Sequence, residues 1–174
     1  MDPVKCKLPP EVLTLVSSIA DESLFHKCCD VHELWNGCPY VTDLRNYGVV
    51  DYWATPMQLS ENGGDCEDYA IAKYYTLAAA GVPVEQMYIV AVRRENESHM
   101  VLAVVDSGST TILDNLRSDP VDVEFCGELS PVYAINHTGL FSVDEEWNFA
   151  LLRADTSNVS LWQDLLKRIE EEQH

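Results

Sequence analysis

Basic side chains are scarce in this sequence: 11 lysines and arginines stand against 29 aspartates and glutamates, which gives a formal net charge of −18. Nucleic acids and anionic lipids both require a basic surface, so this balance argues against either as the main partner. It permits cationic partners and divalent metal ions. For most of these carboxylates, a solvated acidic surface is the simpler interpretation.

Long apolar runs are also missing. No run approaches the roughly 20 residues that cross a bilayer, so we expect no direct membrane insertion. The opening residues MDPVKCKLPPEV lack the basic-then-apolar order of a secretory signal, which predicts either a cytoplasmic protein or one whose leader was removed. Hydrophobic residues make up 47% of the 174 positions, enough for a core, and we expect one domain over residues 1–174.

The cysteines lack a CxxC pair and a regular spacing. A zinc site or a disulfide scaffold is therefore weakly supported. If one cysteine is a free nucleophile, five remain, and at least one of these has no partner within the chain, which favours a reduced compartment. The six are Cys6, Cys28, Cys29, Cys38, Cys66 and Cys126.

The N-terminal third predicts two helices and a loop. Pro9-Pro10 can open a helix, and Asp30 with Glu33 three residues later predicts a second, short helix that stops at Asn36-Gly37. Residues 38–64 are rich in Asn, Gly, Pro and aromatics, and we expect a long ordered loop there. The apolar positions that recur at helical spacing in the first helix are Val12, Leu15, Val16, Ile19, Ala20 and Leu24.

A further helix should begin at Asp65 or Cys66 and run to about Ala80. Gly81 then provides its C-terminal stop, and Pro83 follows just beyond. The residues expected to face inward are Ala70, Tyr74, Leu77 and Ala78.

The rest of the chain predicts strands and a closing helix. Ser107-Gly108-Ser109 is a credible tight connection that would make a hairpin of its two flanking strands. Ser160 and Gln163 predict a capping box for the last helix. The expected strands are 86–93, 100–106, 110–114 and 131–136, and the buried edge of the helix is Leu161, Leu165, Leu166 and Ile169. Helices followed by antiparallel strands indicate an α+β fold with N-terminal helices packed on the sheet.

The stretch NGGDCEDYAIAKYY places Cys66 at the expected start of a helix, directly after two glycines and an aspartate. Backbone N–H groups at a helix N-terminus favour a thiolate, and glycines permit a sharp turn and a close approach of the chain. We therefore consider Cys66 a candidate nucleophile. A small core cysteine is the more common finding at such a position.

A base and an orienting acid are available on the predicted strands. His99 begins the apolar run HMVLAVV, and Asp114 ends the next strand. A hairpin about Gly108 brings both residues to the same end of the sheet, where Asp114 can accept the second imidazole N–H and fix its tautomer. Taken separately, a histidine beside a strand is more often a surface or capping residue, and an aspartate at the position of Asp114 is often a turn former.

Three carboxylates surround the candidate nucleophile: Asp65, Glu67 and Asp68. They could simply be helix N-terminal acids that each stabilise the dipole by ~0.3–1 kcal/mol. However, they repel one another and oppose a thiolate. A bound Ca²⁺ would relieve both problems, and we prefer it to zinc or magnesium because no cysteine–histidine ligand spacing and no phosphate-binding loop is present.

The blocks DYWATPMQLSENGGDCEDYAIAKYYTLAAAGVP, HMVLAVV and ILDNL resemble the bacterial transglutaminase-like cysteine proteinases, in particular those of the LapG type. The resemblance spans roughly residues 38–141, and GDCEDYAIAK is its most specific block. It implies a papain-like and transglutaminase-like α+β core. It also implies a nucleophilic Cys66, His99 as general base and acid, Asp114 as orienting carboxylate, and calcium ligands at Asp65 and Glu67, with Asp68 beside them.

The resemblance further implies a biological role. Members of this type are periplasmic endopeptidases that cut a large surface adhesin near its N-terminus, after a pair of alanines, and so release cells from biofilm. An inner-membrane receptor that senses cyclic di-GMP binds them and holds them inactive. By this resemblance Trp53 and Pro56 are candidates for the receptor contact, although Trp53 fits a core aromatic equally well. We expect Tyr52 or Trp53 to provide a second oxyanion donor beside the Cys66 N–H.

Two other functions stay open at the level of sequence. A cross-linking transglutaminase transfers the acyl group to an amine instead of water and can share all three residues. A binding module could keep the adhesin or receptor surface without catalysis, but its candidate catalytic positions should then be degraded, and here all three are intact. The leading interpretation is therefore a calcium-dependent cysteine endopeptidase.

Overall fold

The structure is a computed structural model that describes residues 5–174, so the first four residues of the segment inspected for a leader lie outside it. The described helices are α1 (Pro10–Ser18), α2 (Leu24–Asn36), α3 (Asp43–Tyr47), α4 (Pro56–Asn62), α5 (Cys66–Ala79) and α6 (Ser160–Glu171). Between residues 5 and 174, no helix is both long and apolar enough to span a membrane.

The strands form one sheet in which every neighbouring pair is antiparallel, in the order β4-β3-β2-β1-β5-β6-β7. They are β1 (Met87–Arg94), β2 (Glu97–Asp106), β3 (Ser109–Leu113), β4 (Val121–Asp122), β5 (Leu129–Asn136), β6 (Gly139–Val143) and β7 (Phe149–Arg153). Two short 3₁₀ helices, η2 (Val84–Gln86) and η3 (Val123–Phe125), precede β1 and follow β4. The predicted α+β class is confirmed.

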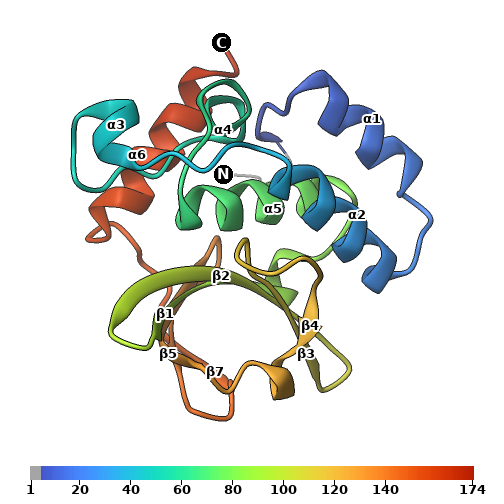
Figure 1. Cartoon of the computed structure of the whole chain (residues 1–174), viewed down its shortest axis with the longest axis vertical. Coiled ribbons are helices and arrows are strands. Elements are labelled where there is room, and N and C mark those ends of the chain that lie inside the picture. The colour runs from blue at the N-terminus through green and yellow to red at the C-terminus, as the bar shows by residue number, and fades with distance from the viewer. Residues whose placement is uncertain (1–4) are drawn as a thin grey trace.

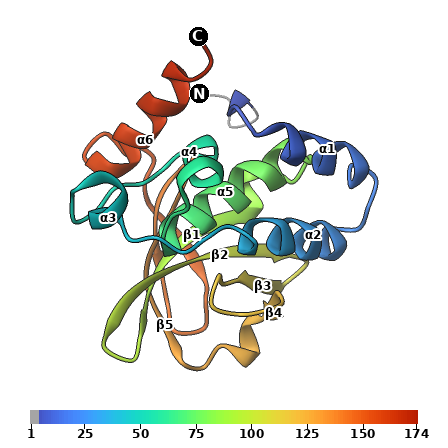
Figure 2. The same ribbon diagram turned by 45° about the horizontal axis from the view of Figure 1, so that its top comes forward.

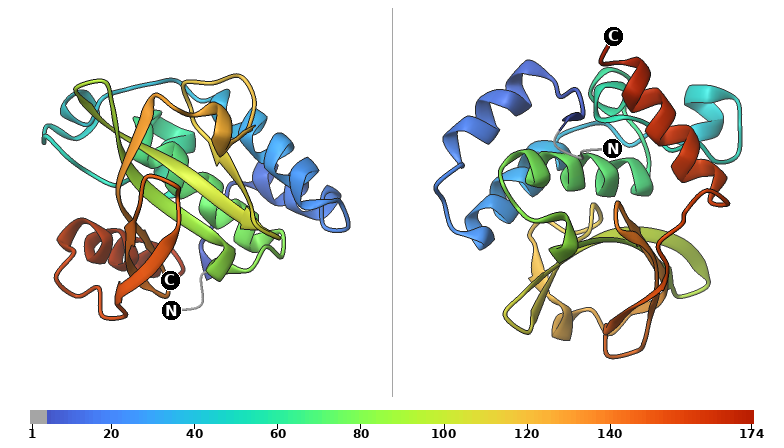
Figure 3. Two further views of the ribbon diagram at one scale, coloured as in Figure 1. Left: turned by 90° about the horizontal axis from the view of Figure 1, so that it is seen from below. Right: turned by 180° about the vertical axis from the view of Figure 1, so that it is seen from behind.

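All six helices lie on one side of the curved sheet (Figure 1), and the same layering is visible from behind (Figure 3). Helix α5 packs directly on β1 and β2. Helices α1 and α2 lie on one flank of α5, while α3 and α6 lie on the other (Figure 2). Because side chains alternate along a strand, the opposite face of the sheet has its own apolar cluster, which includes Val90, Val101, Ile112 and Trp147.

Helix α5 begins and ends where the sequence predicts. Its N-cap is Asp65, and Gly81, with φ 88°, follows the C-cap Ala80. The expected inward residues are all buried, but so is nearly every other residue of the helix. A single inward stripe was therefore too narrow a prediction: the sheet covers one side of α5, and α1, α2 and α4 cover the other.

Three predictions about the N-terminal third are wrong. Helix α1 ends at Ser18, so the expected apolar positions Ile19, Ala20 and Leu24 lie outside it. Helix α2 begins after Ser23, whose hydroxyl accepts from the His26 N–H, so Asp30 lies inside it; the end at Asn36 is correct. The expected loop over 38–64 contains α3 and α4. The start of α4 carries a capping box, since Thr55 accepts from the Gln58 N–H and the Gln58 side chain accepts from the Thr55 N–H.

The C-terminal third needs three corrections. Strands β4, β6 and β7 were not predicted. The N-cap of α6 is Val159, and the predicted capping box is absent because the Gln163 amide donates instead to the Thr156 carbonyl and hydroxyl oxygens. On the inner edge of α6, Leu165 and Ile169 are buried as expected, together with Trp162, whereas Leu161 and Leu166 are half-buried.

Candidate active site

Cys66 is the first residue of α5 and is half-buried. The preceding glycines allow this close approach. Gly63 has φ 72°, and a Cβ atom on Gly64 would lie 2.3 Å from Asp68 Oδ2. The Asp65 N–H donates to the same Asp68 oxygen at 3.1 Å, which fixes the turn into the helix. Because Cys66 is the first residue of the helix, no carbonyl of the helix accepts its backbone N–H.

His99 and Asp114 meet as the hairpin predicts. Leu102 pairs with Leu113 across β2 and β3, so Asp114 follows the strand end beside His99. His99 Nε2 donates to Asp114 Oδ1 at 2.7 Å, and the Leu116 N–H donates to the same oxygen at 2.9 Å. Burial alone would raise the pKa of Asp114, but these hydrogen bonds outweigh it and lower the pKa. One detail differs from the prediction: β2 already begins at Glu97, so His99 lies within the strand.

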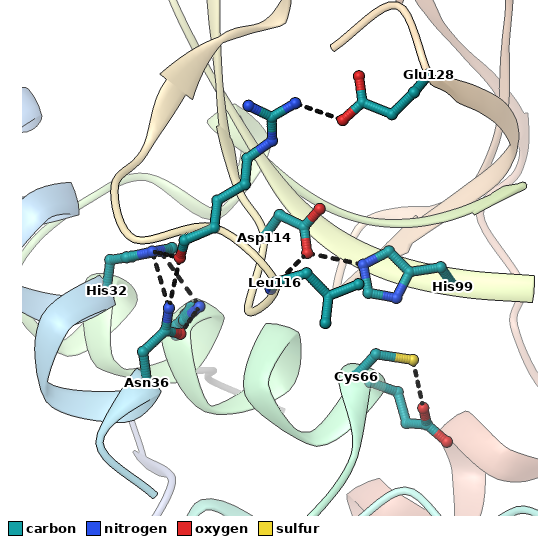
Figure 4. Close-up of polar contacts among 10 residues, drawn as sticks. His32, Asn36, Cys66, His99, Asp114, Leu116 and Glu128 are labelled. Atoms are coloured by element: carbon teal, nitrogen blue, oxygen red, sulfur yellow. Dashed lines mark hydrogen bonds and ion pairs between the residues drawn. The ribbon is translucent and has the colours of Figure 1, made fainter. Parts of the chain in front are cut away.

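Cys66 and His99 line one cavity of about 470 Å³. Figure 4 shows the imidazole with one ring nitrogen bonded to Asp114 and the other turned toward the Cys66 side chain. Because Nε2 is committed to Asp114, Nδ1 is the atom that can exchange a proton with the thiol. His99 is only 7% exposed and Asp114 is fully buried, so the ring is held in place.

The Cys66 thiol donates to Glu67 Oε2 at 3.1 Å. Burial, followed by the charge of Glu67, raises the pKa of this thiol. The repulsion expected from the sequence is therefore present, and it favours the protonated thiol. The geometry can perform nucleophilic chemistry once that negative charge is offset.

The carboxylates extend beyond the three expected from the sequence. Two groups of three acids have ligand atoms within 4.8 Å of one another: one is Asp43, Asp51 and Glu67, and the other is Asp43, Asp65 and Asp68. We refer to these five residues as the acid cluster. Asp43 and Asp51 come from the segment that was expected to be a long ordered loop, and no motif spacing pointed to them.

Backbone donors hold the acid cluster in place without neutralising it. Asp43 Oδ2 accepts from the Tyr52 N–H at 2.6 Å, and Asp68 Oδ1 accepts from the Ala54 N–H at 2.7 Å. Burial, as the largest cause, raises the pKa of Asp43 to about 6, that of Asp68 to about 8 and that of Glu67 to about 9.

The acid cluster fits a hard divalent cation. Asp43 Oδ1 and Asp65 Oδ1 are buried without a hydrogen-bond partner among the described residues. No lysine or arginine of residues 5–174 forms a salt bridge with the cluster. Unpaired carboxylate oxygens from several segments are the ligands that Ca²⁺ takes, so all three predicted ligands, together with Asp43 and Asp51, could hold this ion.

The residues predicted to help at the oxyanion or to bind a partner differ in position. Trp53 lines the cavity and is 3% exposed, in T-shaped contact with Trp162. Tyr52 does not line it: its N–H is bonded to Asp43, and its ring stacks on Tyr47. Of the two, only Trp53 is placed to help at the oxyanion. Pro56 is buried at the start of α4. The burial of Trp53 and Pro56 disfavours a receptor contact through their side chains.

The sequence pointed to no residue of the cavity wall opposite Cys66. Val132 and Tyr133 come from β5, Val50 and Tyr40 from the segments around α3, and Leu161 from α6. Val50 and Tyr40 are exposed, so an extended chain could reach the cavity along them. No short motif links such segments, since the fold alone brings them together.

The chain is similar to solved structures of Legionella pneumophila LapG. One is 32% identical with a TM-score of 0.76, and the matched region covers 91% of this chain and 86% of the LapG chain. A form treated with EGTA is 31% identical with a TM-score of 0.79, over 91% and 86% of the two chains. A calcium-bound form is 33% identical with a TM-score of 0.74, over 91% and 87%.

No match was found among curated protein sequences. Residues 18–125 match the family described as bacterial transglutaminase-like cysteine proteinase. This match covers more than half of the sequence and contains Cys66, His99 and Asp114. Together with the likeness to LapG over nine-tenths of the chain, it shows that this protein belongs to the bacterial transglutaminase-like cysteine proteinase family.

Proposed function

We propose that this protein is a calcium-dependent cysteine endopeptidase in which Cys66 is the nucleophile, His99 the general base and acid, and Asp114 the residue that orients the imidazole. The observation that carries the proposal is the convergence of Cys66 with the His99–Asp114 pair in one cavity, beside the acid cluster. Family membership supports the reaction class.

The chemistry follows from the placement of these side chains. His99 Nδ1 takes the thiol proton as Cys66 sulfur attacks the scissile carbonyl carbon. The Cys66 N–H at the start of α5 stabilises the oxyanion, and Trp53 is the second donor that we propose, because it lines the same cavity. His99 then gives its proton to the leaving amine, and a water molecule, activated by the same ring, hydrolyses the acyl-enzyme.

Calcium is the ion we assign to the acid cluster, because one of the similar LapG structures is calcium-bound and the ligands here are oxygen only. When bound, it offsets the carboxylate charge next to the nucleophile and orders the loop that carries it. Asp43 and Asp51 would supply ligands from the segments around α3, next to the ligands from the start of α5.

The substrate we propose is the N-terminal region of a large surface adhesin, cut after small apolar residues in the periplasm. A cyclic di-GMP-sensing membrane receptor is the proposed inhibitor. The support for both is the resemblance to proteases of the LapG type. The apolar cavity wall formed by Trp53, Met100 and Val132 is compatible with an extended substrate of small side chains.

Cleavage of a candidate adhesin N-terminal fragment tests the proposal. We expect a single cut in Ca²⁺ and none in excess EGTA. Cys66→Ala should abolish cleavage while folding and calcium binding persist. Cys29→Ala, a half-buried thiol on α2, is the matched control and should cleave normally. Incorporation of a fluorescent amine into a glutamine peptide would instead identify a cross-linking transglutaminase. Cleavage that continues undiminished in EGTA would refute the calcium requirement.

A further inference from the structure

A buried polar cluster lies between α2, α5 and the loop that follows β3. It consists of His32, Asn36, Lys73 and the backbone carbonyl of Arg117, and we call it the Lys73 cluster. Figure 4 labels its His32 and Asn36. His32 is 1% exposed, and Lys73 is fully buried. None of these residues lines the cavity that contains Cys66.

The hydrogen bonds of the Lys73 cluster converge on the Arg117 carbonyl oxygen. His32 Nε2 and Asn36 Nδ2 both donate to this oxygen at 3.0 Å. Since a carbonyl only accepts, Nε2 carries the imidazole proton, and Nδ1 is free to accept from Lys73 Nζ at 3.3 Å. The two donor nitrogens, His32 Nε2 and Asn36 Nδ2, lie 2.9 Å from each other because they share one acceptor oxygen. Lys73 also donates to Asn36 Oδ1 at 2.7 Å. Lys73 thereby fixes the orientation of both donors.

The Arg117 carbonyl belongs to the turn that carries Asp114. The Arg117 N–H donates to the Asp114 carbonyl at 3.0 Å, and the Leu116 N–H donates to the Asp114 side chain at 2.9 Å. On the other side of the turn, the Arg117 guanidinium bonds to the Phe125 carbonyl and to Glu128. A continuous set of hydrogen bonds therefore runs from α2 through the turn to Asp114 and on to the His99 ring.

A core position beside β2 and β3 would ordinarily be apolar, because burying an ammonium group is unfavourable unless it has partners. Burial lowers the pKa of Lys73 to about 7, although the charge of Asp114 acts in the opposite direction. The cluster is unfavourable to bury, and its donors converge on one backbone carbonyl next to the site. This combination indicates that the cluster maintains the geometry of the site.

We propose that His32, Asn36 and Lys73 are positioning residues: by holding the Arg117 carbonyl they fix the 114–117 turn, and with it the orientation that Asp114 gives to the His99 imidazole. The inference rests on the proposed roles of Cys66, His99 and Asp114. It requires no knowledge of the substrate, because the state of the site can be measured on the calcium-loaded protein alone.

Three variants isolate the Arg117 carbonyl. Asn36→Asp keeps an acceptor for Lys73 but replaces the amide donor with a carboxylate oxygen. His32→Leu removes the second donor, whereas His32→Gln can restore it, since its amide can donate to Arg117 and accept from Lys73. Thr76→Val is the matched control: it breaks the 2.9 Å bond from Trp35 Nε1 in the same α2–α5 interface, and the Thr76 hydroxyl bonds to Ala72 and Trp35 but not to the 114–117 turn.

The measurements are the rate of Cys66 alkylation by iodoacetamide, followed by mass spectrometry, and the downfield proton resonance of the His99 Nε2–H. We expect Asn36→Asp and His32→Leu to alkylate about tenfold more slowly than the parent, because small misplacements of reacting groups have large effects on rate. Their Nε2–H resonance should move upfield. His32→Gln should regain the parent rate, and Thr76→Val should melt at lower temperature with both readouts unchanged.

The outcome is decided even if His32→Leu does not fold, because Asn36→Asp tests the same carbonyl. Parent-like alkylation and an unchanged resonance in Asn36→Asp would overturn the positioning role. A separate variant, His99→Ala, tests the proposed function: alkylation as fast as in the parent would refute the Cys66–His99 pair, and the positioning role with it. Slow alkylation in His99→Ala but not in Asn36→Asp would refute the positioning role alone.

Discussion

Two polar clusters lie along helix α5, and they differ in what they contain. The acid cluster surrounds its first turn and supplies carboxylates only. The Lys73 cluster begins five residues after Asp68, about one and a half turns along the same helix. It combines an amine, an imidazole, an amide and a carbonyl, and each of these groups has a hydrogen-bond partner within the cluster.

The difference shows which cluster finds all its hydrogen-bond partners within the chain. Buried polar groups are nearly always hydrogen-bonded, and the Lys73 cluster meets this rule with its own residues. In the acid cluster, two buried carboxylate oxygens have no partner in the described part of the chain, and burial, together with the neighbouring Asp65, raises the pKa of Glu67 and Asp68. We therefore expect an external cation to complete the acid cluster, whereas the Lys73 cluster is hydrogen-bonded by groups of the chain itself.

The two clusters also act on different members of the site. The acid cluster adjoins Cys66, whose thiol donates to Glu67. The Lys73 cluster supports the turn that carries Asp114. If this division is correct, substitutions at the two ends of the site should separate calcium binding from catalysis.

Asp114→Asn should have the largest effect on activity. The amide retains the shape of the side chain but no longer enforces the correct imidazole tautomer, and we expect kcat to fall by about 10⁴-fold. Calcium affinity should not change, because Asp114 lies outside the acid cluster. Kinetics on the cleaved fragment and calorimetry with Ca²⁺ measure the two quantities. Asp106→Asn, at the exposed end of β2, is the control; a parallel loss of calcium affinity in Asp114→Asn would contradict the division.

Asp43→Asn should show the opposite selectivity. Asp43 belongs to both triplets of acids, so its loss should weaken Ca²⁺ binding at least about tenfold. At saturating Ca²⁺ the cleavage rate should recover toward that of the parent. Calorimetry and a calcium titration of activity measure this, with Asp30→Asn on the exposed face of α2 as the control. Unchanged affinity would exclude Asp43 from the calcium site.

Much of the site could be predicted because its signals are local. The Gly-Gly-Asp sequence before Cys66 marks the start of α5, and the turn at Gly108 sets the hairpin register that joins His99 to Asp114. Each of these relations depends on a few consecutive residues or on one tight turn.

The missing parts depend on contacts that only the complete fold creates. Asp43 lies 22 residues before Asp65 in sequence, and Asn36 lies 37 before Lys73, with no motif connecting either pair. Strand β7 was missed because Ala150, Leu151 and Leu152 are all exposed, so the alternation that indicates a strand is absent. Helix α3 has only five residues, too short for a periodic signal.

Lys73→Met gives the smallest effect and the most direct check on whether the Lys73 cluster is complete. The pKa of Lys73 is lowered to about 7 in the folded protein, against about 10.4 for an unperturbed lysine. Between these pH values the unfolded chain binds a proton that the folded protein has released. The free energy of unfolding of the parent should therefore gain up to about 1.4 kcal/mol per pH unit from this residue.

The methionine variant lacks this gain. In urea unfolding at pH 7, 8 and 9, the free energy of unfolding of the parent should therefore rise relative to that of Lys73→Met. Lys167→Met changes the net charge equally at an exposed position of α6 and serves as the control. If both variants show the same pH dependence, Lys73 holds its proton as firmly in the folded protein as in the unfolded chain. His32, Asn36 and the nearby Asp114 would then compensate fully for the burial of the ammonium group, and the contrast with the acid cluster would be sharper still.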